Sequence, residues 1–146
     1  MAARFYDLEA KSKLSQKRKL SAFLDELVKS YRPEVKKVSL NYLFRTDEAL
    51  HQVNVDFLQH DTYTDIITFD LSENPESLEA EIHVSTERVA ENATSFGTDY
   101  QTELHRVIFH GALHLSGLKD KTAADARRMR TAEDAALKAY FNPENR

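Results

Sequence analysis

The sequence contains no cysteine, and this absence excludes several kinds of chemistry at once. Disulfide bonds, thiolate zinc sites and cysteine nucleophiles are all ruled out, so a bound metal must be held by histidine and carboxylate side chains. Glycine and proline are also scarce, with 3 of each among 146 residues. This composition excludes glycine-rich phosphate loops, Rossmann-type nucleotide sites and long flexible linkers.

Long apolar runs are missing as well. The sequence has no stretch of about 18 or more apolar residues that could span a membrane, and MAARFYDLEAKSK at its start lacks the apolar core of a secretory signal. We therefore expect a cytoplasmic protein with no membrane association. The formal net charge of −4 is not the basic excess of a dedicated duplex-binding protein. A length of 146 residues with 41% hydrophobic residues predicts a single domain over residues 1–146.

Hydrophobic periodicity predicts an α+β fold in which a small mixed β-sheet packs with about five helices. Apolar residues at helical spacing predict helices over residues 14–31, 46–58, 86–95, 99–115 and 122–141. Strands are predicted over residues 36–44, 64–71 and 80–85, with residues 5–8 as a further strand at the front. The nearly continuous apolar character of 64–71 is typical of an inner strand. His83 alternates with apolar neighbours, so we expect its side chain to face solvent or a groove.

Residues 110–121 are HGALHLSGLKDK, which places two histidines four positions apart on an apolar segment. Residues at this spacing lie one helical turn apart on the same face, so His110 and His114 can direct imidazole nitrogens at one point. Gly117 can take a positive φ, end the helix and turn the chain back past the histidines. Asp120 then supplies an anionic oxygen, giving a His-His-Asp set with a fourth position for water. The same spacing is also compatible with two histidines of an ordinary packed or solvated helix.

The position after the first histidine separates this segment from the HExxH motif of zinc peptidases. Those enzymes carry a glutamate there as general base, whereas this chain has Gly111. Peptide hydrolysis by the usual route therefore lacks its base, and no other general base is evident. His105 lies about 140° around the helix from His110, so we predict that it points away from the metal-binding face.

The segment HGALHLSGLKD resembles the HGxLHLxGYDH signature of the YbeY family, bacterial metal-dependent endoribonucleases that act in ribosomal RNA maturation. TYTDIITFDL at 62–71 resembles the TDVLSFP strand of that family. AEIHVSTERVAENA at 80–93 resembles its GDIxIS strand and the helix that follows. Order and spacing agree over roughly residues 46–135.

The resemblance implies a zincin-like helix that carries the metal site and a single-strand-specific, metal-dependent endoribonuclease acting in ribosomal RNA processing and ribosome quality control. It implies that His110, His114 and Asp120 hold one Zn²⁺. Mn²⁺ is the alternative, because Asp120 stands where the family has a third histidine and a carboxylate is a harder ligand. Single-stranded ribosomal RNA is the implied substrate, with ribosomal proteins or a ribosome-associated GTPase as partners.

The chain also departs from the family pattern at Leu58, which stands where the family commonly has an arginine before the TDVLSF-like strand. His60, two positions further on, is most simply a solvated loop residue, and it is also a candidate to approach the substrate phosphate in place of that arginine. Arg106, beside the site helix, is the second predicted substrate contact. Three arginines of the last helix are further candidates, although such residues usually lie on a solvated face: Arg127, Arg128 and Arg130.

Two alternative functions remain open at this point. Leu58 and Asp120 favour a non-catalytic, ribosome-associated binding module whose metal site has decayed. A metal-dependent hydrolase of another substrate, such as a peptide, is the second alternative, and the missing glutamate at Gly111 counts against it.

Overall fold

The structure is a computed structural model that describes residues 1–142. Pro143, which the sequence places after the last helix, lies outside the described residues. The described part has four strands and five helices, in the order β1 (Ala3–Asp7), α1 (Lys17–Tyr31), β2 (Lys37–Arg45), α2 (Asp47–Leu58), β3 (Ile66–Asp70), β4 (Ser77–Ser85), α3 (Thr86–Phe96), α4 (Tyr100–Leu115) and α5 (Ala123–Phe141). The predicted α+β class is confirmed. Within residues 1–142, no helix has the length and apolar character needed to cross a membrane.

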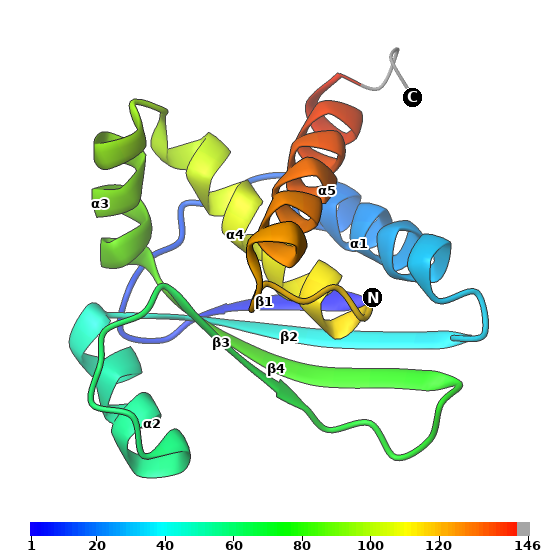
Figure 1. The fold of residues 1–146 in the computed structure, drawn as a ribbon, viewed down its shortest axis with the longest axis horizontal. Helices are drawn as coiled ribbons and strands as arrows, with labels where there is room; N and C mark the ends of the chain where they lie inside the picture. Colours follow the sequence, from blue (N-terminus) through cyan, green and yellow to red (C-terminus); the bar gives the residue numbers. More distant parts are fainter. Residues whose placement is uncertain (143–146) are drawn as a thin grey trace.

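The four strands form one mixed sheet in the order β1-β2-β4-β3. Strands β1, β2 and β4 run parallel to one another, and β3 pairs antiparallel with β4. Helices α1, α3, α4 and α5 lie on one side of the sheet, whereas α2 lies on the other side (Figure 1). Helix α1 forms the crossover between the parallel strands β1 and β2, whereas α3, α4 and α5 follow the last strand.

Strand β3 is an edge strand, so the prediction of an inner strand at 64–71 was wrong. Its two faces are nevertheless covered. Ile66 faces Gly111 of α4, whereas Ile67 packs with Leu50 and Val53 of α2 in a second apolar cluster. The continuous apolar sequence of β3 reflects burial of both its faces, which is typical of an inner strand. One edge of β3 nevertheless has no neighbouring strand within residues 1–142.

His83 is buried at 5% exposure, so the prediction that it faces solvent or a groove was wrong. Its Nε2 lies 2.6 Å from Glu81 Oε1, and its Nδ1 lies 3.3 Å from Arg45 Nη1. The ring of Phe69 packs edge-on against the imidazole at 5.5 Å. Neighbouring strands thus cover a side chain that the alternation pattern correctly placed on the opposite face from Ile82 and Val84.

Some element boundaries differ from those predicted, by up to three residues at the starts of α1 and β4. Helix α1 begins at Lys17 rather than at 14, because Gln16 before it has a left-handed backbone with φ 53°. Strand β4 begins at Ser77 rather than at 80. Thr46 caps α2 by accepting a hydrogen bond from the Ala49 N–H, and Gly97 ends α3 with φ 68°.

Helix α4 is fixed directly on the sheet. The buried hydroxyl of Tyr42 in β2 donates a hydrogen bond of 2.8 Å to the carbonyl of Ile108. One turn along, Gly111 lies so close to the sheet that a Cβ there would stand 2.9 Å from Ile66 Cδ1 and 3.3 Å from Ile82 Cγ2. The glycine after the first histidine is therefore explained by packing, because a side chain there would point into the sheet.

Candidate functional site

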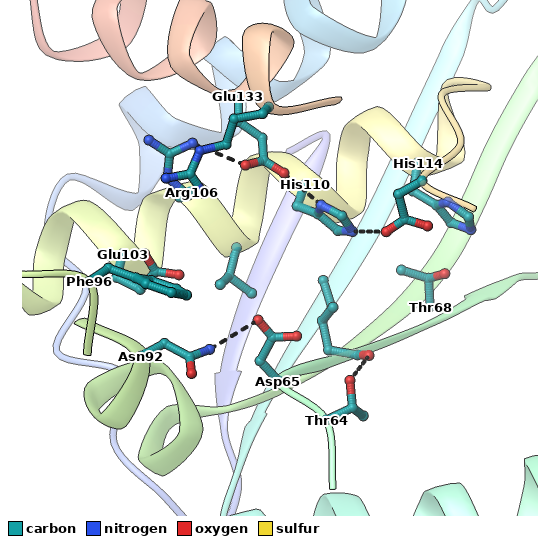
Figure 2. Close-up of a pocket in the computed structure, with 14 residues that line it drawn as sticks. Thr64, Asp65, Thr68, Asn92, Phe96, Glu103, Arg106, His110, His114 and Glu133 are labelled. Carbon is teal, nitrogen blue, oxygen red and sulfur yellow. Dashed lines mark hydrogen bonds and ion pairs between the residues drawn. The ribbon is translucent and has the colours of Figure 1, made fainter. Parts of the chain in front are cut away.

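One face of α4 lines a cavity of about 440 Å³. Glu103, Val107, His110 and His114 recur at the three- and four-residue spacing of a helix face, and all four line this cavity. The cavity lies between α4, the start of β3, helix α3 and the middle of α5 (Figure 2). The predicted face of the two histidines is thus the wall of a pocket.

The end of α4 brings Asp120 to His110. Gly117 has a φ of 111°, and its N–H donates to the carbonyl of His114 at 3.1 Å. The Leu118 N–H donates to the carbonyl of Leu113 at 3.1 Å, which completes the helix end. The chain then turns back so that Asp120 Oδ2 lies 3.5 Å from His110 Nε2. The predicted role of Gly117 in returning the aspartate to the histidine is confirmed.

A buried glutamate of α5 holds the other nitrogen of His110. His110 Nδ1 donates to Glu133 Oε2 at 2.7 Å, and Glu133 Oε1 accepts from Arg106 Nη1 at 3.0 Å. Arg106 Nη2 also donates to Asp134 Oδ1 at 2.7 Å. Glu133 is only 5% exposed. With Nδ1 protonated toward Glu133, the Nε2 lone pair of a neutral His110 faces Asp120 and the cavity.

Carboxylates outnumber cations around the cavity. Four acidic residues line it with two arginines: Asp65, Glu103, Asp120, Glu133, Arg106 and Arg130. Burial lowers the pKa of His110, but the hydrogen bond and charge of Glu133 and the charges of Asp120 and Asp65 outweigh it and raise that pKa above its ordinary value. Burial also raises the pKa of Asp65, against the charge of His110. The site therefore favours a positively charged ligand.

The three predicted metal ligands are only partly brought together. His110 and Asp120 form a close pair, and His114 lines the same cavity one turn along α4. The His114 side chain is exposed and has no hydrogen bond or ion pair within residues 1–142. As the side chains stand, no group of three His, Asp or Glu residues in the described chain could hold a metal ion.

The structure separates the predicted substrate contacts. His60 is exposed in the turn after α2 and is not among the residues that line the cavity. Arg106 lines the cavity, with its two terminal nitrogens paired to carboxylates. Arg130 is an exposed cavity residue that has no ion pair in the described part of the chain. Arg127 and Arg128 line a different groove. The role of each in substrate binding stays a prediction.

His105 points away from the cavity, as its helical position indicated. It is buried, its Nδ1 donates to the carbonyl of Gln101 at 2.7 Å, and its ring stacks on Tyr140 at 5.4 Å. The prediction that it lies off the face of His110 and His114 is confirmed.

Three acidic cavity residues were missed from the sequence, although two of them carried a usable signal. Glu133 shares the buried stripe of α5 with Met129, Ala132 and Ala136, and a charged residue on an apolar stripe is unusual. Glu103 lies two helical turns before His110 on the same face. Asp65 precedes β3, and only tertiary packing brings it to α4.

These observations define a class of protein: an α+β fold in which a helix-borne histidine pair and a returning aspartate line an acid-rich cavity beside a mixed sheet. The chain belongs to the YbeY endoribonuclease family, because the family model described as Endoribonuclease YbeY matches residues 6–141.

Individual relatives agree with this assignment. The chain is 43% identical over 133 residues to Endoribonuclease YbeY of Cytophaga hutchinsonii, covering 91% of this chain and 92% of that protein. It is 40% identical to Endoribonuclease YbeY of Flavobacterium johnsoniae, covering 95% of this chain and 97% of that protein. Among solved structures, it matches the solution structure of TM1509 from Thermotoga maritima with a TM-score of 0.61 and 25% identity, covering 98% and 91% of the two chains.

Proposed function

We propose that the chain is a metal-dependent endoribonuclease that cleaves single-stranded RNA. The observation that carries this proposal is the pairing of His110 Nε2 with Asp120 Oδ2 at 3.5 Å, in a cavity that His114 also lines. Membership of a family whose members are named endoribonucleases supports the choice of substrate.

His110, His114 and Asp120 would hold one Zn²⁺ ion, with Mn²⁺ as the alternative because of the aspartate. The chemistry of these side chains fits a metal. The hydrogen bond from His110 Nδ1 to Glu133 reproduces the carboxylate–histidine arrangement that orients metal-binding imidazoles in proteins. A divalent ion bound there would polarise a phosphoryl oxygen or lower the pKa of bound water.

Other side chains of the cavity would contact the phosphate, accept a proton and position Glu133. Arg130 has no ion pair within residues 1–142 and lines the cavity, so it is available to contact a substrate phosphate. Asp65 is the carboxylate that we infer to accept the proton of the attacking nucleophile, because burial raises its pKa above the usual carboxyl range and its only side-chain hydrogen bond in the described chain is from Asn92 at 3.5 Å. Arg106 would act mainly by holding Glu133 in place.

The acidic cavity explains why a metal would be required. Four carboxylates line the space that a negatively charged phosphodiester must enter. Without a bound cation, these carboxylates would repel the substrate.

We further propose, from the family resemblance, that the substrate is ribosomal RNA in the cytoplasm. Ribosomal proteins or a ribosome-associated GTPase would then supply specificity in RNA processing and ribosome quality control.

The proposal is tested by incubating the purified protein with an end-labelled RNA in single-stranded and duplex form. We expect cleavage of the single strand alone, its loss after treatment with a chelator, and its recovery when Zn²⁺ or Mn²⁺ is added. Ribosome binding without cleavage under every metal condition would contradict the proposal in favour of a binding module. Casein digestion would instead identify a peptidase, which the packing of Gly111 against the sheet disfavours.

A further inference from the structure

The cavity extends beyond the His110–Asp120 pair to a second end, formed by Asn92, Phe96 and Glu103. Asn92 and Phe96 lie one turn apart on α3, and Glu103 lies in the first turn of α4. Figure 2 shows these three side chains grouped together away from His114, with Asp65 between this group and His114. We call this group the Phe96 end. None of its three members has a part in the metal site proposed above.

Glu103 is a largely buried residue whose carboxylate has no protein partner in the described part of the chain. It is 4% exposed, and its carboxylate has no hydrogen bond or ion pair within residues 1–142. Burial raises its pKa, against the charge of Arg106. No buried side-chain oxygen within residues 1–142 lacks a hydrogen-bond partner, so the carboxylate oxygens of Glu103 are open to the cavity. Glu133, which lines the same cavity, differs because its two oxygens are both hydrogen-bonded. Glu103 is therefore an acceptor that faces the cavity and lacks a donor.

Phe96 presents an aromatic face at the same end. It is 61% exposed although it lines the cavity, and it is the last residue of α3 before Gly97. Single-stranded nucleic-acid binders use exposed aromatic rings of this kind as platforms on which bases stack. An aromatic platform beside a carboxylate that faces the cavity fits a flat ligand with N–H groups on one edge.

We propose that the Phe96 end binds a guanine base of single-stranded RNA, stacked on Phe96 with its N1–H and N2–H₂ groups donating to the Glu103 carboxylate. This inference rests on the proposed endoribonuclease function and adds base specificity to it. The bound guanine lies in the same cavity as the metal site, next to the phosphate that is cleaved.

Guanine is selected by its hydrogen-bonding edge. It carries two neighbouring N–H donors on its Watson–Crick edge, which match the two oxygens of a carboxylate. Adenine and cytosine place a ring nitrogen acceptor beside their amino group, and the second oxygen of Glu103 would face it. Uracil has its single N3–H between two carbonyl acceptors. A specific polar pocket typically rejects a ligand that leaves its buried groups unpaired.

The first test compares cleavage rates of wild-type protein on short single-stranded RNAs of uridine that contain one guanosine, adenosine or cytidine at a fixed position. We expect kcat/KM beside guanosine to exceed that beside adenosine by about 10-fold, the order of discrimination of one bidentate base contact. Glu103→Gln should remove this preference, and Phe96→Ala should lower cleavage beside every base. The control is Phe57→Ala, on an α2 phenylalanine that is 70% exposed and lies outside the cavity.

The second test does not depend on catalysis. Guanosine and adenosine, which lack phosphate, are titrated into metal-free protein and followed by chemical-shift changes of the Phe96 and Glu103 backbone amides. Tighter binding of guanosine supports the inference even if Glu103→Gln fails to fold. Equal cleavage beside all bases, or equal binding of the two nucleosides, contradicts the guanine site but not the proposed endoribonuclease function. Absence of cleavage of any RNA contradicts the proposed function instead.

Discussion

The imidazole of His110 and the carboxylate of Glu133 meet at 2.7 Å, although they come from two helices and are 23 positions apart in the chain. Through this contact, α5 fixes the ring orientation of a residue on α4. The same carboxylate accepts from Arg106 at 3.0 Å, so Glu133 is held from both sides. A metal-binding histidine oriented in this way keeps its Nε2 directed at the ion.

Glu133→Gln should therefore weaken metal binding without changing any ligand. We expect metal affinity to fall by about 10- to 100-fold, the usual effect of removing the carboxylate behind a metal-bound histidine. The affinity is measured by competition with a chelator of known strength. Asp134→Asn is the matched control, because Asp134 pairs with the same Arg106 but not with His110. Equal losses in the two variants would show that Arg106, rather than His110, transmits the effect.

Arg130→Ala should weaken RNA binding. We expect KM to rise by about 3- to 10-fold at low ionic strength, with kcat less affected, and the effect to shrink at high salt because exposed charges are screened. Arg128→Ala is the control, since Arg128 lies on the same helix but lines a different groove and pairs with Asp125 at 3.5 Å. An unchanged KM in the Arg130 variant would remove this residue from the substrate site.

Gly111→Glu, which would restore the residue order of HExxH peptidases, should destabilise the fold and create no peptidase. The new side chain would point at Ile66 and Ile82, so overpacking adds to the burial of a carboxylate, at a combined cost of about 3 kcal/mol or more. Gly111→Ala should cost far less, because Ile66 Cδ1 is the end of a flexible side chain. Denaturant unfolding measures both variants. A fully stable glutamate variant would mean that α4 sits farther from the sheet.

His105 should make folding sensitive to acid. Burial lowers its pKa below the ordinary value of 6.5, although the Gln101 carbonyl opposes this. As the pH falls, the unfolded chain binds a proton at His105 that the folded chain excludes, so the wild-type protein loses stability. His105→Gln does not titrate and is less stable at neutral pH. The difference in unfolding free energy between wild type and His105→Gln should therefore shrink by about 1 kcal/mol from about pH 7.5 to about pH 5.5. If urea unfolding gives the same free-energy difference at both pH values, the pKa of His105 is not lowered.

The sequence was sufficient for the elements and for part of the site, because both depend on local spacing. The histidine pair follows from helical periodicity, and the return of Asp120 follows from the backbone freedom of Gly117. Residues brought from other elements were harder to find. Asp65 reaches the cavity only because β3 packs under α4, and no local pattern marks that contact.

The two wrong predictions have a common physical cause. Alternation and apolar runs show which faces of a strand are covered, but not which elements cover them. β3 has two covered faces and still lies at an edge, and His83 faces away from the main core and is still buried by Phe69 and Arg45. Strand order and side-chain cover depend on tertiary packing, which the local pattern does not contain.

The most direct measurement is the metal content of purified wild-type protein, His114→Ala and Asp120→Ala, with cleavage of a single-stranded RNA assayed on the same samples. His60→Ala should keep its metal, because His60 lies outside the cavity. We expect about one metal ion per wild-type chain, lost together with cleavage in both site variants. If Asp120→Ala retains both its metal and its activity, Asp120 is not a ligand. A wild-type protein that cleaves RNA without any bound metal would contradict the central claim.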